Sequence, residues 1–231
     1  MEQFVVSARK YRPQAFEAVV GQSHITDTLL KSVANDHLAQ ALLFCGPRGV
    51  GKTTCARILS KVINGGADLT DEELALNIFE LDAASNNSVD DIRRLIDQVR
   101  FAPQTGKFKV YIIDEVHMLS QQAFNAFLKT LEEPPAHAIF ILATTEKHKI
   151  IPTILSRCQI FDFKRITVDD IAAHLAFVAQ KEGVTAEPEA LHMIAEKADG
   201  ALRDALSLFD RMISFSGNEL TYEQVVNVLD I

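Results

Sequence analysis

The sequence of 231 residues is poor in cysteine, in long apolar runs and in positive charge, and each shortage excludes a class of protein. Its three cysteines, Cys45, Cys55 and Cys158, show no C-x-x-C spacing, which fits neither a disulfide framework nor a zinc site. No apolar run approaches the length of a membrane span, and the N-terminal residues lack the apolar core of a signal peptide. We therefore expect a soluble, reduced, cytoplasmic protein with no membrane partner.

Acidic residues outnumber basic ones by 31 to 23, which gives a formal net charge of −8. This balance argues against a general nucleic-acid coat, although a local basic face remains possible. Hydrophobic residues make up 48% of the chain, which is enough for a sizeable core. The length allows one large domain, or one medium domain and a small one.

Short apolar runs alternate with helical patterns over the first two thirds of the chain. Several runs are apolar at nearly every position, which is typical of strands covered on both faces of a parallel sheet. The expected strands are 41–45, 77–83, 109–114, 138–144 and 159–163. This alternation predicts an α/β fold with a five-stranded parallel sheet flanked by helices.

Two of the expected helices have recognisable first residues. Ser88 and Asp91 resemble a capping box at the start of one helix, and Ser120 can cap the helix that follows it. From about Thr167 the patterns are helical only, and no strand pattern returns. We therefore expect an α/β domain over 1–165 and a small all-helical domain over 166–231. Within the first of these, 64–77 is expected to be a loop with at most one helical turn.

A glycine-rich stretch, "FCGPRGVGKTT", follows the first expected strand and precedes a helix. It matches the phosphate-loop pattern G-x-x-x-x-G-K-S/T in the structural context that this motif requires. Backbone N–H groups of such a loop converge on phosphate oxygens, the lysine reaches the β- and γ-phosphates, and the hydroxyl binds Mg²⁺. The alternative, a tight turn with an incidental lysine, is disfavoured by the complete pattern. The expected nucleotide-binding residues are Gly46, Arg48, Gly49, Val50, Gly51, Lys52, Thr53 and Thr54.

A second acidic site lies at the end of the third expected strand, where the apolar residues of "VYIIDEVH" are followed by two carboxylates. Asp114 is placed to hold Mg²⁺ with Thr53, and Glu115 to orient or deprotonate the attacking water. Binding alone needs only the first carboxylate, so the second indicates hydrolysis. The alternative is a pair of solvated acids at a strand end. His117 is interpreted as structural or surface, because a single histidine after a strand is more often that than a base.

Three further features have ordinary explanations on local grounds. Thr144 and Thr145 end the fourth strand, where a hydroxyl could position the water or the γ-phosphate, but threonine is also common in strands. Arg157 lies at a helix end and could be a surface arginine. Arg203 begins a helix of the second domain and could pair with Asp204.

Taken together, "RKYRPQAFEAVVGQ", "GPRGVGKTT", "ELDAASNNSVDDIRRL", "YIIDEVHMLS", "FNAFLKTLEEPP", "ILATTE", "ILSRC" and "GALRDALS" closely resemble the bacterial DNA polymerase III gamma/tau subunits. These are the ATPase motor subunits of the sliding-clamp loader and belong to the AAA+ superfamily of P-loop NTPases. The resemblance covers nearly the whole chain except 64–76.

The resemblance implies roles for the residues that have ordinary local explanations. Thr145 resembles the sensor of the γ-phosphate, and Arg203 the lid-domain arginine that closes on the nucleotide. Arg157 resembles the arginine finger that reaches into the neighbouring subunit's site. Residues similar to the family's segment around the adenine and ribose are Tyr11, Arg12, Pro13, Val19, Val20 and Gly21.

The family's DNA contacts come partly from helices that line the inside of a spiral of subunits. The helix that starts after Ser88 corresponds to one of them, so its arginines Arg93, Arg94 and Arg100 are candidates for phosphate contact. The competing interpretation is that Asp90 and Asp97 pair with Arg93 or Arg94 along the helix.

The sequence departs from the family in two places. Most relatives insert a four-cysteine zinc module where this chain has the cysteine-free segment 64–76, so we expect no zinc. The family's third domain, which forms the oligomeric collar, has no counterpart here, so we expect a truncated ATPase module that is monomeric and weakly active alone.

The leading hypothesis is an ATP- and Mg²⁺-dependent motor module of the DNA polymerase III clamp loader. Its expected partners are the other clamp-loader subunits, the sliding clamp and primed DNA. The alternatives are an ATP-binding scaffold that does not hydrolyse, or another AAA+ DNA motor such as a branch-migration helicase.

Overall fold

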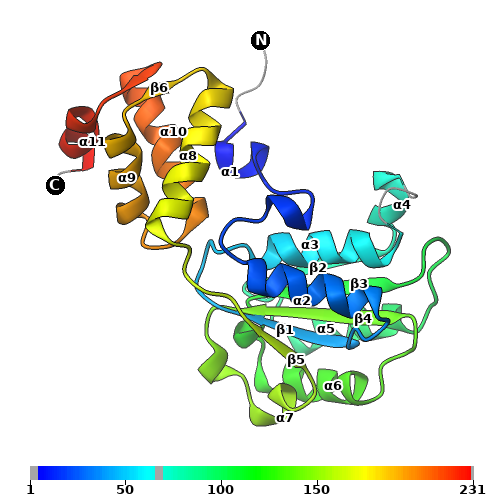
Figure 1. Cartoon of the computed structure of the whole chain (residues 1–231). Coiled ribbons are helices and arrows are strands. Elements are labelled where there is room, and N and C mark those ends of the chain that lie inside the picture. The colour runs from blue at the N-terminus through cyan, green and yellow to red at the C-terminus, as the bar shows by residue number, and fades with distance from the viewer. Residues whose placement is uncertain (1–4, 66–69, 230–231) are drawn as a thin grey trace. The chain divides into compact units, whose positions relative to one another are not determined.

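The computed structural model describes residues 5–65 and 70–229, which form two compact units (Figure 1). The sheet unit comprises residues 24–46 and 52–163, and the helical unit comprises residues 5–23, 47–51 and 164–229. The N-terminal segment thus groups with the helical unit. The boundary between residues 165 and 166 stays a prediction.

The sheet unit is built on five parallel strands in the order β2-β3-β4-β1-β5. The strands are β1 (Ala41–Cys45), β2 (Ile78–Asp82), β3 (Lys109–Asp114), β4 (Ala138–Thr144) and β5 (Gln159–Asp162). The predicted five-stranded parallel sheet is therefore confirmed. Strands β1 and β4 are buried at every position, as their uninterrupted apolar sequences require.

Helices cover both faces of this sheet, as Figure 1 shows. Helices α2 (Ser23–Ala34) and α3 (Lys52–Ile63) lie on one face, and α5 (Val89–Val99) and α6 (Gln121–Glu132) lie on the other. The Ser88 hydroxyl accepts a hydrogen bond from the Asp91 amide, and the Ser120 hydroxyl accepts one from Ala123. Both predicted caps are confirmed, whereas α2 was not predicted.

The helical unit contains α1 (Ser7–Lys10), α8 (Val168–Glu182), α9 (Pro188–Lys197), α10 (Leu202–Ser216) and α11 (Tyr222–Leu229). The prediction that no strand follows residue 167 is wrong in one detail. Strands β6 (Thr185–Ala186) and β7 (Glu219–Leu220) form a small parallel pair. Two residues are too few to produce a periodic sequence pattern. No helix among the described residues has both the length and the apolar character needed to cross a bilayer.

The segment 64–77 contains helix α4 (Asp71–Ala75), slightly longer than the single turn expected. Thr70 and Glu73 form a capping box that fixes its first residue. Residues 66–69 of this segment lie outside the described residues.

An unpartnered hydroxyl lies in the core of the sheet unit. The Tyr111 side chain is fully buried, stacked between Phe79 and Phe140 at ring-centroid distances of 5.0 Å and 5.5 Å. Its hydroxyl has no hydrogen-bond partner among the described residues, and burial raises its pKa to about 12. A buried polar group without a partner destabilises the folded state.

Tyr111→Phe is therefore expected to raise the free energy of unfolding by about 1 kcal/mol, since it removes the hydroxyl and keeps the stacked ring. Urea denaturation of both proteins measures this change. Tyr111→Leu, which also removes the ring stacking, is the matched control and should destabilise the fold. A loss of stability in Tyr111→Phe would show that the hydroxyl is hydrogen-bonded in solution.

Candidate active site

The carboxyl ends of the central strands bring the candidate residues to one edge of the sheet. Cys45 at the end of β1 pairs with Thr144 of β4, and Asp82 at the end of β2 pairs with Asp114 of β3. In open parallel α/β sheets, ligands bind beyond this edge. The loops that follow β1, β3 and β4 carry the residues that the sequence singled out.

The loop between β1 and α3 depends on glycine at three positions. Gly46, Gly49 and Gly51 have φ values of 150°, 76° and 103°, which other residues rarely adopt. A Cβ at Gly46 would also lie 2.6 Å from the carbonyl oxygen of Phe163, whereas a Cβ at Gly51 would meet no atom within 4 Å. Open space beside Gly51 at the N-terminus of α3 matches the geometry that a phosphate group needs.

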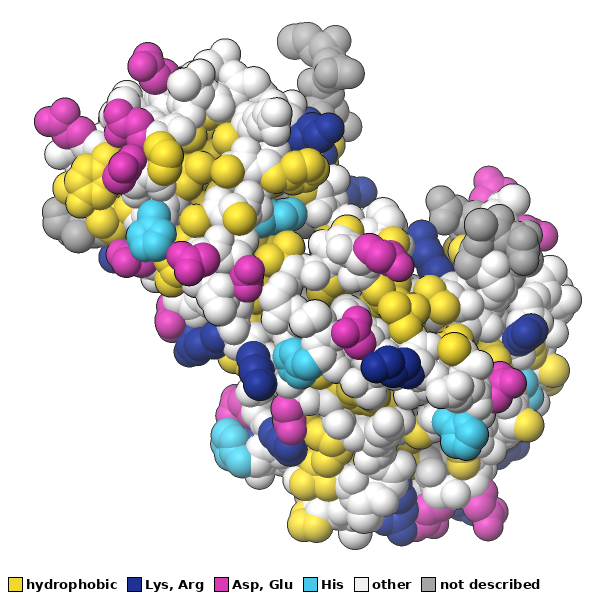
Figure 2. Space-filling model, viewed as in Figure 1, with side chains coloured by type: hydrophobic (Ala, Val, Ile, Leu, Met, Phe, Trp, Pro, Cys, Tyr) yellow, Lys and Arg dark blue, Asp and Glu magenta, His cyan; other side chains and the backbone are white. Residues whose placement is uncertain are grey.

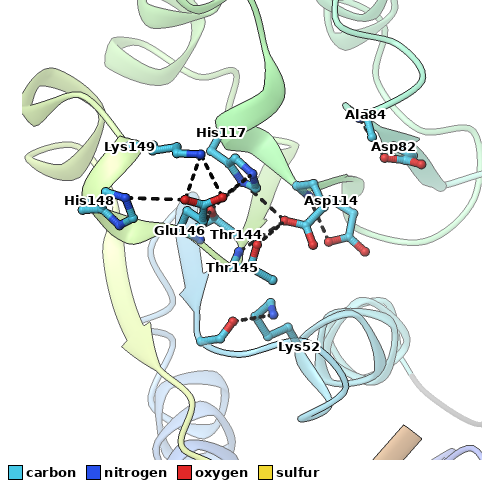
Figure 3. A network of polar contacts seen from close by, with 12 residues as sticks. Lys52, Asp82, Ala84, Asp114, His117, Thr144, Thr145, Glu146, His148 and Lys149 are labelled. Atoms are coloured by element: carbon cyan, nitrogen blue, oxygen red, sulfur yellow. Dashed lines mark hydrogen bonds and ion pairs between the residues drawn. The ribbon is translucent and has the colours of Figure 1, made fainter. Parts of the chain in front are cut away.

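Lys52 is the first residue of α3 and is only 6% exposed. Its ammonium donates a hydrogen bond of 2.7 Å to the carbonyl oxygen of Gly46 (Figure 3). Burial lowers its pKa, and the carboxylates of Glu115 and Asp114 oppose that shift. A buried lysine costs folding free energy, so its presence at the end of a glycine loop favours a functional role.

Thr53 and Asp114 place two oxygens together next to Lys52. The Thr53 hydroxyl donates a hydrogen bond of 2.7 Å to Oδ2 of Asp114, and Oδ1 accepts one of 3.0 Å from the Glu115 amide. A hydroxyl and a carboxylate are hard oxygen ligands of the kind that Mg²⁺ takes beside phosphate oxygens. The donor set therefore fits this ion.

Glu115 has a left-handed backbone conformation, with φ 48° and ψ 45°. This region is uncommon for residues other than glycine, and such outliers concentrate at functional sites. Its Oε2 accepts hydrogen bonds from the Thr145 hydroxyl at 2.9 Å and from the Thr145 amide at 3.3 Å. The structure thus joins the predicted water-activating residue to the predicted phosphate sensor.

His117 and Glu146 extend this network (Figure 3). His117 lies in the short helix η3 (Val116–Met118), with its side chain 6% exposed. Its Nδ1 is 2.9 Å from the Thr144 hydroxyl oxygen and 3.3 Å from Oε2 of Glu115, and its Nε2 is 3.7 Å from Oε1 of Glu146. A hydrogen bond from Lys149 is the largest cause of the lowered pKa of Glu146.

Sequence reasoning did not identify these two residues as part of the site. It treated His117 as structural or surface and did not consider Glu146. The one available signal was their position, because each follows a central strand within a few residues of its carboxyl end.

Two predicted site arginines lie outside this network. The backbone N–H of Arg203 approaches the carbonyl oxygen of Gly49 at 3.4 Å within the helical unit, and the Arg203 side chain makes no ion pair among the described residues. Arg157 instead donates hydrogen bonds to the carboxylate of Glu132 and, at 2.6 Å, to the carbonyl oxygen of Thr153.

The N-terminal segment predicted to lie around the base belongs to the helical unit. Tyr11 and Val20 pack against its core, and the Tyr11 hydroxyl donates a hydrogen bond to Glu182. Arg12 and Pro13 are partly buried. Their role in binding a base stays a prediction.

The candidate DNA-binding arginines form ion pairs along α5, in which Arg93 and Arg94 lie and which Arg100 directly follows. Arg93 lies 3.3 Å from Asp90, Arg94 lies 3.7 Å from Asp91, and Arg100 lies 4.0 Å from Asp97. The arginine side chains are all highly exposed, so these pairs hold them only weakly. Basic and acidic side chains also lie next to one another over the visible face of the sheet unit (Figure 2).

Two family models match the chain. Residues 21–167 match the model described as "DNA polymerase III, delta subunit", and residues 170–218 match "DNA polymerase III clamp loader subunit, ATPase lid domain".

Curated relatives match over nearly the whole chain. The chain is 52% identical to the DNA polymerase III subunit tau of Bacillus subtilis, over 94% of this chain and 41% of that protein. It is 44% identical to the tau subunit of Escherichia coli, over 98% of this chain and 37% of that protein. It is 37% identical to the DNA polymerase III subunit gamma of Buchnera aphidicola subsp. Acyrthosiphon pisum, over 99% of this chain and 67% of that protein. The chain therefore spans about two fifths of the length of the two tau relatives.

Among solved structures, the Thermotoga maritima RuvB Holliday junction branch migration motor is similar, with a TM-score of 0.73 and 22% identity over 95% of this chain and 72% of that one. A point mutant of the same RuvB has a TM-score of 0.74 and 21% identity, over 96% of this chain and 73% of that one. At this identity the likeness shows the fold alone, and together with the match to the ATPase lid model it confirms the α/β AAA+ fold predicted from the sequence.

Proposed function

Since the chain belongs to the DNA polymerase III tau/gamma subunit family, we propose that it is the ATP-binding and ATP-hydrolysing motor module of a bacterial sliding-clamp loader. In this function it works in the cytoplasm with the other loader subunits. ATP binding and hydrolysis drive the opening of the sliding clamp and its release on primed DNA.

The observation that best supports this function is the convergence of Lys52, Thr53 and Asp114 at the end of the glycine loop. The ammonium of Lys52 is fixed at 2.7 Å from the Gly46 carbonyl oxygen, and the Thr53 hydroxyl at 2.7 Å from Asp114. A triphosphate requires this combination of a cation, backbone amides and hard oxygen ligands.

Each group of the network has a task in hydrolysis. Thr53 and Asp114 would hold Mg²⁺, which when bound neutralises charge on the phosphate oxygens. Lys52 binds the β- and γ-phosphates, and Glu115 orients the attacking water and accepts its proton. In this proposal the Thr145 hydroxyl, which donates a hydrogen bond to Glu115 in the structure, contacts the γ-phosphate when the nucleotide is bound. Binding without hydrolysis would need neither Glu115 nor Thr145.

Arg203 lies in the segment that matches the ATPase lid model. In this proposal it senses the γ-phosphate, which is supported by the proximity of its backbone to Gly49 within the helical unit. Tyr11, Arg12, Pro13 and Val20 form the wall beside the adenine. Residues Arg48, Val50 and Thr54 complete the phosphate loop.

The partners and the DNA contacts belong to the assembled loader. Arg93, Arg94 and Arg100 are the proposed phosphate contacts, and their exposed, weakly held guanidinium groups are free to exchange an aspartate for a DNA phosphate. The net charge of −8 is compatible with this role because only the inner face of α5 needs to be basic.

Glu115→Gln tests the proposed hydrolysis. The variant is expected to bind ATP as tightly as the parent and to hydrolyse it about 10²- to 10⁴-fold more slowly, since the proton acceptor is lost while Lys52 and Thr53 remain. Single-turnover hydrolysis with excess protein and an equilibrium ATP-binding assay measure the two quantities.

Glu133→Gln is the matched control, because Glu133 is an exposed carboxylate at the end of α6 and lies outside the network. It should change neither quantity. Equal hydrolysis by Glu115→Gln and the parent would reject the role of Glu115, and an absence of hydrolysis in a loader assembled with the parent chain would contradict the motor function and favour an ATP-binding scaffold. Failure of the parent to bind ATP would reject nucleotide binding itself.

A further inference from the structure

His117 has a nearly buried side chain in contact with Glu115. Its side chain is 6% exposed, and its two ring nitrogens approach different carboxylates, Nδ1 that of Glu115 at 3.3 Å and Nε2 that of Glu146 at 3.7 Å. The Nδ1 atom faces two oxygens, those of Thr144 at 2.9 Å and Glu115 at 3.3 Å. No role for this histidine follows from nucleotide binding alone.

The two carboxylate oxygens of Glu115 have different surroundings. Oε2 accepts hydrogen bonds from the Thr145 hydroxyl and amide, and it also lies 3.3 Å from Nδ1 of His117, whose hydrogen-bond partner is the Thr144 hydroxyl. Oε1 makes no hydrogen bond within the described residues. One oxygen is therefore held by two hydrogen bonds from Thr145 and lies against the His117 ring, while the other is left to accept a hydrogen bond from a water molecule.

The orientation of the Glu115 carboxylate depends most on His117 when the Thr145 hydroxyl contacts a phosphate. In the proposed function the Thr145 hydroxyl turns to the γ-phosphate, so Oε2 keeps the Thr145 amide and His117. The opposite ring nitrogen, Nε2, faces Glu146, which is fixed by Lys149 at 2.8 Å and by a hydrogen bond from its own amide to Thr144 at 3.0 Å. The ring is thus held on both sides.

We propose that His117 is a positioning residue for ATP hydrolysis: its ring, fixed through Nδ1 at the Thr144 hydroxyl, lies 3.3 Å from Oε2 of Glu115 and keeps that carboxylate oriented so that Oε1 faces the attacking water. This inference rests on the proposed function, because it acts through Glu115. It assigns no proton transfer to His117 and no contact with the nucleotide.

The inference is tested by replacing His117 with amide side chains, each of which places a nitrogen where one of the two imidazole nitrogens lies. In His117→Asn the amide nitrogen occupies the place of Nδ1, and in His117→Gln it occupies the place of Nε2. A misplacement of about 1 Å can cost about 10²-fold in rate. Single-turnover hydrolysis should therefore fall about 10²-fold in His117→Gln and His117→Ala and only a few fold in His117→Asn, with unchanged ATP affinity in all three.

A double variant separates positioning from general structural damage. His117→Ala added to Glu115→Gln should cause no further loss, because the carboxylate that His117 positions is already absent. His148→Ala is the matched control, since His148 also contacts Glu146, at 3.5 Å, but lies outside the contacts of Glu115. It should hydrolyse ATP like the parent.

Three results would overturn the inference: hydrolysis unchanged in all three His117 variants, an equal loss in all three, or a further loss in the double variant. Should His117→Ala not fold, the comparison between His117→Gln and His117→Asn still decides, and thermal melting identifies that case. A parent chain that neither binds nor hydrolyses ATP would instead reject the proposed function.

Discussion

Replacing Lys52 with alanine is expected to weaken ATP binding by the chain about a hundredfold. The side chain carries an ammonium group fixed at the end of the glycine loop, where it approaches the Gly46 carbonyl oxygen at 2.7 Å. A hydrogen bond to a charged group contributes about 1.5–3 kcal/mol, or roughly 10- to 150-fold in affinity, and the triphosphate loses at least one such bond. Equilibrium binding of a fluorescent ATP analogue, with Mg²⁺ present, measures the change.

The loss of affinity should not be accompanied by a loss of stability. Burial lowers the pKa of Lys52, so the folded chain disfavours the charged ammonium compared with the unfolded chain. Lys52→Met, which keeps the aliphatic stem, should therefore be at least as stable as the parent. Its ATP affinity should be as low as that of Lys52→Ala, because the ammonium group is absent from both.

Lys61→Ala on the last turn of the same helix is the matched control and should retain affinity. Tight ATP binding by Lys52→Ala would reject the phosphate loop, and the motor function with it.

The sheet and the phosphate loop could be predicted because both are encoded locally. A strand buried on both faces needs an apolar residue at nearly every position, as in "ALLFC" and "AIFILAT", and runs of this length are short for a helix. The phosphate loop is also encoded locally. Its backbone takes positive φ values at Gly46, Gly49 and Gly51, and glycine is the residue that adopts such values most readily.

The interior of the site could not be predicted, because it is created by strand register. Glu115 and Thr145 are 30 positions apart and meet because β3 and β4 are adjacent and parallel. The left-handed backbone of Glu115 has no sequence signal either, since glutamate rarely adopts it. His117 was underestimated for the same reason, as its neighbours Thr144 and Glu146 come from the following strand end.

The sequence predicted ion pairs between aspartates and arginines along α5, but not all of the partners. Asp90 does pair with Arg93, but Arg94 pairs with Asp91, and Asp97 pairs with Arg100. Several i, i+3 and i, i+4 choices are nearly equal in energy on an exposed helix, so rotamers decide among them. DNA contact by these arginines stays a proposal.

Arg157→Ala is expected to lower ATP turnover of an assembled loader by about 10³- to 10⁵-fold, the range known for arginines supplied to a neighbouring phosphoryl-transfer site. The reason is that, in the proposed function, Arg157 is the arginine finger that completes the adjacent subunit's site, as its resemblance to the family implies. Within its own chain the guanidinium contacts Glu132, the Thr153 carbonyl oxygen and the Ser156 hydroxyl, and none of the residues around Lys52. Steady-state ATPase assays of loaders assembled from parent or variant subunits measure the effect.

The same substitution in the isolated chain distinguishes action on a neighbour from damage to the fold. Single-turnover hydrolysis by the chain alone, shown to be monomeric by sedimentation, should be slow and insensitive to Arg157→Ala. Arg165→Ala serves as the matched control in the assembled loader, because Arg165 also forms an intramolecular ion pair, with Asp199. An equal loss in monomer and assembly would place the effect within one chain, and rapid turnover by the monomer would contradict a finger supplied by a neighbour.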